Sequence, residues 1–313
     1  MTSEDERVAL LAGIFAAKSA EVRLGIGDDA AVLEGGLVWT VDAQVEGVHF
    51  RLDWMTWEDV GFRATMAAAS DVVAMGGRPI AILGSLVLSS RVTDEDLAAL
   101  ARGQAAAAAI AGAPVCGGNL ARGGETSITT TVLGRAERPV PRSGAAAGDG
   151  VWIAGPVGLA AAALRGYLQN ASGSDPRLAP ALAAFRRPRA RFAEGLAAAA
   201  SGASAAVDVS DGLARDVARI AQASNVRIAL DARAILAHGG DALDGAAAAI
   251  GAEPLDLALH GGEDYALVVT SKAPVPGFTP IGVVEPSGGS MLVLVSDSGR
   301  TDLAPRGWDH FAT

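Results

Sequence analysis

The sequence is poor in cysteine, lysine and aromatic residues, and each shortage excludes a class of protein. Cys116 is the only cysteine, so the chain can form no internal disulfide and no thiolate zinc site. Lysine occurs only at Lys18 and Lys272, and the pattern GxxxxGK followed by Ser or Thr is absent, which excludes the P-loop nucleotide fold. The set of residues that protein kinases use is also missing. Aromatic residues make up 4% of the chain, which indicates a core of small, closely packed side chains.

The chain also lacks a basic stripe and a long apolar run. Its formal net charge is −10, so neither nucleic acid nor a membrane is an expected partner. Residues 1–18 open with acids, and their apolar run is too short to cross a bilayer. We therefore expect a first helix there, in a cytoplasmic protein. An acidic protein can still bind a polyanion when a divalent metal reverses the local sign of charge.

The chain is long enough for two domains. Its 313 residues can build two cores of ordinary size. The stretch 137–150 is rich in Pro, Gly and Ala and reads as a link between them. We expect an N-terminal domain over residues 1–137 and a C-terminal domain over residues 150–313.

Local patterns predict helices and strands in mixed order. Capping boxes, Thr56 with Asp59 and Thr93 with Asp96, predict the starts of two helices. A longer helical stretch is expected from about Pro180 to Ser201. Several neighbouring strands have no helix between them, so we expect an α+β fold rather than a doubly wound parallel sheet. The predicted strands include 36–42, 80–90, 114–119, 126–136, 151–155, 226–231, 265–270, 279–284 and 291–296.

Acidic residues gather at strand ends and in glycine-flanked turns. A single acid in such a place is equally well explained as a helix cap or a turn residue. As a set they would repel one another unless they were protonated, hydrogen-bonded or bound to cations. Oxygen ligands alone favour Mg²⁺ over Zn²⁺, and Mg²⁺ usually shares its shell with substrate phosphates, which makes phosphate chemistry the leading class. The acids concerned are Asp28, Asp29, Asp42, Asp71, Asp208, Asp211, Glu263 and Asp264.

Eight motifs occur along the chain in a characteristic order: LGIGDDAAVL, VDAQVEGVHF, ASDVVAMGG, CGGNLARG, PRSGAAAGD, VDVSDGLARD, GGEDYAL and GWDHFA. In order and rough spacing the sequence resembles the thiamine-monophosphate kinase family over nearly its whole length. This family shares a superfamily with aminoimidazole ribonucleotide synthetase, selenophosphate synthetase and a hydrogenase maturation protein. The resemblance implies ATP-dependent phosphorylation of thiamine monophosphate to thiamine diphosphate, by direct in-line transfer assisted by several Mg²⁺ ions and without a general base.

The resemblance also implies an architecture and a set of contacts. It implies two α+β domains: an N-terminal mixed sheet with helices that forms the interface of a homodimer, and a C-terminal α/β-type domain packed against it. The implied magnesium ligands are Asp29, Thr40, Val41, Asp42, Asp71, Asn119, Asp208 and Asp211. The implied ATP contacts are Gly118, Asn119, Arg142 and Ser210. The implied contacts to thiamine monophosphate are His49, Glu263 and Trp308.

Two positions depart from the family pattern. Asn119 stands where the family commonly has an aspartate, and Val41 stands where it usually has a hydroxyl residue. Each departure removes a charge or an oxygen from the expected metal region. Two alternatives therefore stay open: an ATP-dependent synthetase of the same superfamily that acts on an amidated ribonucleotide, and a protein that binds nucleotide or thiamine phosphates with little turnover. Selenophosphate synthetase is disfavoured because no reactive cysteine lies near the N-terminus.

Overall fold

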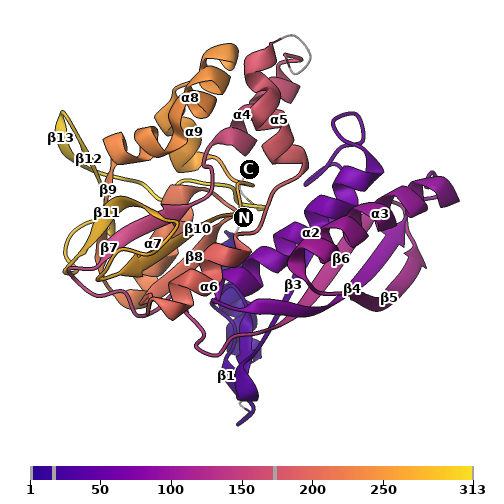
Figure 1. Cartoon of the computed structure of the whole chain (residues 1–313), viewed down its shortest axis with the longest axis horizontal. Coiled ribbons are helices and arrows are strands. Elements are labelled where there is room, and N and C mark those ends of the chain that lie inside the picture. The colour runs from indigo at the N-terminus through magenta and orange to yellow at the C-terminus, as the bar shows by residue number, and fades with distance from the viewer. Residues whose placement is uncertain (1–2, 16–18, 172–174, 312–313) are drawn as a thin grey trace.

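Two mixed β-sheets lie side by side in the molecule (Figure 1). The computed structural model describes residues 3–15, 19–171 and 175–311. Within these residues the first half of the chain supplies a six-stranded sheet and the second half a seven-stranded sheet. Each sheet combines antiparallel pairs with one parallel pair, β4 with β5 in the first and β9 with β12 in the second. The predicted α+β fold is confirmed.

The first sheet has the strand order β1-β2-β3-β6-β4-β5. Its strands are β1 (Val22–Leu24), β2 (Ala31–Leu33), β3 (Leu37–Val45), β4 (Arg78–Leu88), β5 (Val115–Arg122) and β6 (Ser127–Arg135), and the turn η1 (Glu34–Gly36) precedes β3. Helices α2 (Trp57–Ala74) and α3 (Asp94–Ala111) pack against each other and against strands of this sheet. Strand β5 lies at the edge of the sheet, and every residue in it is exposed.

The second sheet has the strand order β13-β12-β9-β11-β7-β10-β8. Its strands are β7 (Gly150–Ala154), β8 (Ala205–Val209), β9 (Arg227–Asp231), β10 (Ala266–Ser271), β11 (Thr279–Glu285), β12 (Leu292–Ser296) and β13 (Gly299–Asp302). The helical elements of this half are α4 (Leu159–Leu168), η2 (Pro176–Leu178), α5 (Ala179–Arg186), α6 (Phe192–Ala200), α7 (Leu213–Ser224), α8 (Ala232–Ile250) and α9 (Pro254–His260). Strands β8 and β10, which run through the centre of the molecule, are buried along their whole length.

Most of the predicted helix starts are confirmed. Thr56 and Thr93 form the capping boxes of α2 and α3. The first helix is α1 (Glu4–Ile14), and residues 1–2 and 16–18 of the predicted stretch lie outside the described residues. The single helical stretch predicted from Pro180 to Ser201 is wrong, because α5 and α6 are separate helices. Pro188 disfavours helical backbone at the residue before it, and Arg187 accordingly has φ −131° and ψ 68°.

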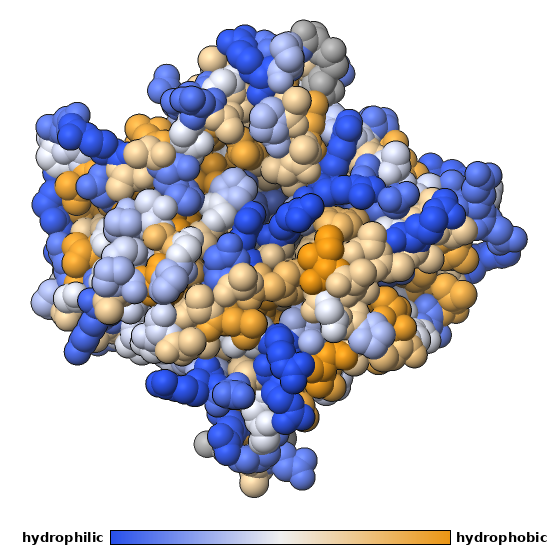
Figure 2. Space-filling model, viewed as in Figure 1, coloured by the Kyte–Doolittle hydropathy of each residue, from blue (hydrophilic) through white to orange (hydrophobic). Residues whose placement is uncertain are grey.

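Ion pairs connect the two halves of the chain beside α2. Arg187 forms ion pairs with Glu58 at 2.9 Å and with Asp59 at 2.6 Å, which join the start of α2 to the end of α5. A band of hydrophilic side chains crosses the middle of this face of the molecule (Figure 2). The division into residues 1–137 and 150–313 stays our proposal for the domains. No helix among the described residues has the length and apolar character needed to cross a membrane.

Helices α2 and α3 approach each other at two glycines. A Cβ atom at Gly61 would lie 2.0 Å from the carbonyl oxygen of Leu100, and one at Gly103 would lie 1.9 Å from that of Glu58. A backbone carbonyl cannot swing aside as the end of a side chain can, so only glycine fits at either position. This close approach buries α2 from Val60 to Ala74 almost completely, and it places the helix between α3 and both sheets.

We expect Gly103→Ala to destabilise the fold. The added methyl group must push the two helices apart, and we expect a loss of about 2 kcal/mol or more in the free energy of unfolding, measured by urea denaturation. The matched control is Gly245→Ala in α8, where the nearest atom to a new Cβ is 3.8 Å away. The control should be neutral or slightly stabilising, and equal stability of the two variants would contradict the packing described here.

Candidate active site

Acidic side chains from three elements converge where α2 meets the two sheets. Thr40 and Asp42 share one face of β3, because side chains two residues apart in a strand point the same way. Asp71 comes from α2, and the Thr40 hydroxyl donates to its Oδ2 at 2.5 Å. Asp208 comes from β8 in the other half of the chain, and the Ser70 hydroxyl of α2 donates to its Oδ2 at 2.7 Å. The site is therefore built by both halves.

Arg142, from the segment between the sheets, holds the acid pair that precedes β2. Its Nε donates to Asp29 Oδ1 at 3.1 Å, its Nη2 pairs with the same oxygen, and its backbone N–H donates to Asp28 Oδ2 at 3.0 Å. Burial and the charge of Asp29 raise the pKa of Asp28 to about 6. The Asp29 side chain is 1% exposed, and its Oδ2 is buried without a hydrogen-bond partner among the described residues. A bound cation would relieve the cost of that unpaired oxygen.

The crowding of carboxyl groups changes their acidity. Burial first, and then the charges of neighbouring carboxylates, raises the pKa of Asp71 and that of Asp208 well above the usual value. Burial and the nearby Glu263 raise the pKa of Asp42 to about 6. These groups are harder to ionise than ordinary aspartates, so the site favours either protons or bound cations.

A pocket of about 150 Å³ opens onto these acids. The predicted site residues that line it are Val41, Asp42, His49, Asp71, Asp208, Ser210, Asp211, Glu263 and Trp308. Three further predicted residues do not line the pocket but connect to it through a chain of contacts. The Thr40 hydroxyl donates to Asp71 and also lies 3.4 Å from the Asp29 carbonyl oxygen. Arg142 in turn pairs with the Asp29 carboxylate. One pocket thus gathers most of the predicted magnesium and substrate residues.

Gly118 and Asn119 lie away from this pocket, and Val41 differs from the other lining residues in the direction of its side chain. Gly118 and Asn119 lie on the edge strand β5, where they line a separate open hollow of about 670 Å³. Val41 points to the opposite face of β3 from Thr40 and Asp42, and it is 65% exposed. Only its backbone carbonyl can therefore serve as a ligand beside these two residues. The predicted roles of Gly118, Asn119 and Val41 stay predictions.

A buried arginine that the sequence analysis missed holds Glu263. Arg63 of α2 is 1% exposed and pairs with Glu263 Oε2, to which the Tyr265 hydroxyl also donates at 2.9 Å. The guanidinium of Arg63 also donates to the Phe185 carbonyl, and it lies 4.6 Å from the centroid of the Phe185 ring. Glu263 has φ +68° and Tyr265 has φ +49°, a backbone region that non-glycine residues rarely adopt. No local pattern indicates Arg63, because it stands in an alanine-rich helix.

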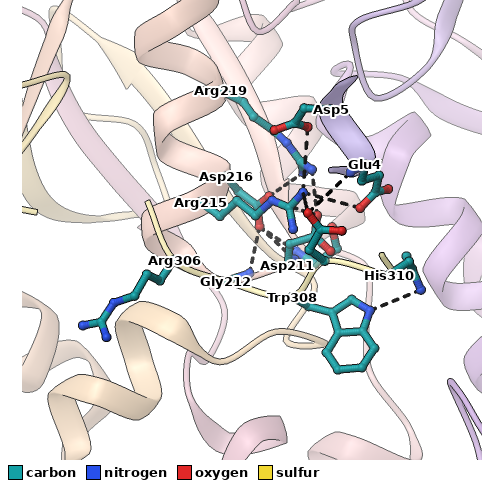
Figure 3. A network of polar contacts seen from close by, with 12 residues as sticks. Glu4, Asp5, Asp211, Gly212, Arg215, Asp216, Arg219, Arg306, Trp308 and His310 are labelled. Atoms are coloured by element: carbon teal, nitrogen blue, oxygen red, sulfur yellow. Dashed lines mark hydrogen bonds and ion pairs between the residues drawn. The ribbon is translucent and has the colours of Figure 1, made fainter. Parts of the chain in front are cut away.

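Three rings from two distant segments meet at the pocket. The His49 and His310 ring centroids lie 5.0 Å apart. Trp308 Nε1 donates to His310 Nδ1 at 3.3 Å (Figure 3). The backbone N–H of Val45 donates to His49 Nδ1 at 3.1 Å, which places the proton of the neutral ring on Nε2. Burial lowers the pKa of His49, so its imidazole is neutral at pH 7. His310 was not predicted, although it stands in the motif GWDHFA.

Asp216, in the first turn of α7, fixes the turn that carries Ser210 and Asp211. Its Oδ2 accepts hydrogen bonds from the backbone N–H groups of Ser210, Asp211 and Gly212 at 3.0 to 3.1 Å. Arg219 pairs with both Asp211 and Asp216 at 2.7 Å (Figure 3). Burial raises the pKa of Asp216 to about 7. Sequence reasoning missed Asp216, although an acid in the first turn of a predicted helix is a usable signal.

The arrangement is suited to binding phosphates together with cations. Among the described residues, no three histidine, cysteine, aspartate or glutamate side chains form a ready-made metal site. The carboxylates instead stand around a small pocket, so a bound ligand would have to supply further oxygens. Mg²⁺ is commonly bound in this way, by one or two carboxylates, waters and substrate phosphates.

Comparison with known proteins identifies the family. The family model for the N-terminal domain of AIR synthase related proteins matches residues 27–136, and the model for their C-terminal domain matches residues 146–298. The chain is 40% identical over 302 residues to the thiamine-monophosphate kinase of Mycobacterium tuberculosis, a match that covers 93% of this chain and 87% of that protein.

Solved structures agree with the sequence matches. A structure described as AaThiL complexed with AMPPCP and TMP superposes with a TM-score of 0.88 at 30% identity, over 99% of this chain and 97% of that one. The thiamine monophosphate kinase of Aquifex aeolicus superposes with a TM-score of 0.84 at 28% identity, over 96% and 98%. The resemblance seen in the sequence is confirmed, and this chain belongs to the thiamine-monophosphate kinase family within the AIR synthase related proteins.

Proposed function

We infer that this chain phosphorylates thiamine monophosphate with ATP, forming thiamine diphosphate and ADP. The observation that carries this conclusion is the single pocket in which acids from both halves of the chain meet His49, Glu263 and Trp308. Family membership supports it, since the matched relatives are named thiamine-monophosphate kinases and one matched structure holds an ATP analogue and TMP.

The chemistry requires charge control more than proton transfer. The attacking group is a phosphate oxygen that is already anionic at neutral pH, so no general base is needed and we assign no catalytic base. Two highly charged phosphates must instead be brought together and aligned for in-line transfer. In this proposal Ser210 and Arg142 contact ATP, together with Gly118 and Asn119 of β5.

We further propose that several Mg²⁺ ions act here. The donors fit that metal, because they are oxygens and because Asp29 Oδ2 is buried with no hydrogen-bond partner in the part of the chain that the structure describes. Bound Mg²⁺ neutralises phosphate charge and orients the reacting groups. The residues that would hold it are Asp29, Thr40, Asp42, Asp71, Asp208 and Asp211, with the Val41 carbonyl and the Asn119 amide oxygen as further candidates.

The proposed function is tested by product analysis. The protein is incubated with ATP, Mg²⁺ and thiamine monophosphate, and ADP and thiamine diphosphate are measured together. Equal amounts of both products are expected. ADP formed only when another acceptor, such as an amidated ribonucleotide, is supplied would favour a synthetase of the superfamily. Tight binding without turnover would favour the phosphate-binding alternative.

We expect Asp42→Asn and Asp71→Asn each to reduce turnover severely. Each substitution removes a charge that helps to hold a cation against the phosphates, and a loss of about 10²-fold or more matches the removal of one electrostatic element. Turnover is measured by thiamine diphosphate formation over a range of Mg²⁺ concentrations. Asp53→Asn is the matched control, since Asp53 is an exposed partner of Arg51. Near-normal turnover of either site variant at limiting Mg²⁺ would remove that residue from the metal set.

We also propose that the chain forms a homodimer through the first sheet. Trp39 and Val41 of β3 point away from α2 and are 53% and 65% exposed. Leu83 of β4, 46% exposed, shares this face, because Val41 and Leu83 both pair in register with Thr131. An exposed apolar patch of this kind on a sheet commonly marks a protein interface.

We expect Leu83→Asp to weaken the dimer. A charge placed in the apolar interface must lose its hydration when the two sheets meet, so the variant should elute as a monomer, with its mass measured by light scattering. Wild type and the control Leu168→Asp, at a leucine 63% exposed in the other half, should both show twice the mass of one chain. A monomeric wild-type protein, or an unchanged dimer in Leu83→Asp, would contradict this interface.

A further inference from the structure

The last described residues, 304–311, form a segment that we call the C-terminal strap. The strap follows β13 and carries Trp308 and His310 to the pocket. Two contacts involve its backbone: the Trp308 N–H donates to the Asp211 carbonyl at 2.9 Å, and a ring nitrogen of His260 lies 3.2 Å from the Arg306 carbonyl. Trp308 is itself 51% exposed. The position of its indole therefore depends on what anchors the strap.

Arg215 of α7 is the centre of that anchor (Figure 3). Its side chain is 9% exposed, and four carboxylates from three parts of the chain lie around its guanidinium. Glu4 lies at 3.4 Å and Asp5 at 3.8 Å, both from α1. Asp309 of the strap lies at 3.8 Å, and Asp211, at the start of α7, at 3.9 Å. One cation thus joins the two ends of the described chain to the turn that borders the pocket.

The charge of Arg215 is what lets these acids lie together. Asp309 also accepts a hydrogen bond from the Glu4 N–H at 3.4 Å, and the Arg7 guanidinium lies 3.9 Å above the Phe311 ring, so α1 packs against the strap. Without the guanidinium, the Asp309 carboxylate would face those of Glu4 and Asp211 with less positive charge between them. Repulsion would then push the strap away from α7.

A steric contact fixes the strap at the same place. A Cβ atom at Gly307 would lie 2.4 Å from the Asp211 carbonyl oxygen and 2.9 Å from the Arg215 Cβ. The strap can therefore lie against the start of α7 only because residue 307 has no side chain. The charge of Arg215 and the close contact at Gly307 therefore both fix the strap next to Trp308.

We propose that Arg215 is a positioning residue for thiamine monophosphate, acting through the C-terminal strap. Arg215 does not line the pocket; it holds the strap so that Trp308 and His310 face the thiamine-binding end. This inference rests on the proposed function. Its consequence is selective, because loss of the anchor affects the recognition of thiamine monophosphate, whereas Asp211 keeps its closer ion pair with Arg219 at 2.7 Å and the acids of β3, α2 and β8 do not contact Arg215.

The first test separates the two substrates. For Arg215→Met we expect the KM for thiamine monophosphate to rise about tenfold while the KM for ATP changes by less than about twofold. Arg215→Lys keeps the positive charge, so its KM for thiamine monophosphate should stay within about threefold of wild type. Gly307→Ala should reproduce the selective effect by shape alone. The matched glycine control, Gly245→Ala, should change neither KM.

The second test asks whether Arg215 acts through the strap. In a double-mutant cycle with Trp308→Ala, the two substitutions should not add, because each removes the same contact with the substrate. Trypsin cleavage after Arg306 reports the order of the strap without any turnover, and it should be faster in Arg215→Met. Thiamine monophosphate, added alone, should slow this cleavage in wild type.

The outcomes separate the inference from the function on which it rests. If wild type makes no thiamine diphosphate, the proposed function fails, and calorimetry with thiamine monophosphate alone then decides the role of Arg215: a weaker Kd in Arg215→Met supports it and an unchanged Kd overturns it. If wild type is active, three results overturn the inference. They are an unchanged KM for thiamine monophosphate, an equal rise in both KM values, and full additivity with Trp308→Ala.

Discussion

Repulsion among buried carboxylates is the constraint around which this pocket is organised. Asp42, Asp71 and Asp208 come from β3, α2 and β8, and burial is the first cause that raises the pKa of each. Neighbouring carboxylates raise these pKa values further: Asp208, Asp29 and Asp42 act on Asp71, Asp29 acts on Asp208, and Glu263 acts on Asp42. Arg142 pairs with Asp29 and Arg63 pairs with Glu263, so each of these cations is already engaged with one acid. Burial and the surrounding carboxylates therefore leave the three central acids with raised pKa values. A ligand that brings cations and phosphates together completes the balance.

Helix α2 allows acids from two halves of a chain to meet. It carries Asp71 and Ser70 at the pocket and Arg63 beneath Glu263, and it packs against β3, β6 and β8. Because α2 packs against neighbours on several sides, it needs small side chains, which explains its many alanines. It also explains the glycines Gly61 and Gly103, where α2 and α3 approach closely. Small side chains are thus a condition for the site as well as for the core.

The sequence allowed us to predict those site residues that stand in a local pattern or in a family motif. The family motifs named Asp42, Asp71 and Asp208 as magnesium ligands, and the structure brings the three into one pocket, while their role as ligands stays a prediction. Arg63, Asp216 and Arg215 were missed because their roles depend on partners that pattern alone does not assign: Arg63 meets Glu263 two hundred positions away. Helix α8 was also missed, since Gly239 and Gly240 interrupt its pattern, and the structure shows non-helical backbone at Gly240. The edge position of Asn119 follows from strand order, which only the fold defines.

We propose that burial and mutual repulsion destabilise the acid cluster until cations bind. Because the folded pKa of Asp42 is about 6 against an ordinary 3.8, the folded state holds the extra proton, and stability falls as pH rises through that window. The direct measurement is the free energy of unfolding at about pH 5.5 and about pH 7.5, with and without saturating Mg²⁺. We predict lower stability at the higher pH without Mg²⁺, and a larger stabilisation by Mg²⁺ there than at the lower pH. Equal stabilisation by Mg²⁺ at both pH values, or no stabilisation at either, would contradict the proposal that cations relieve repulsion in the acid cluster.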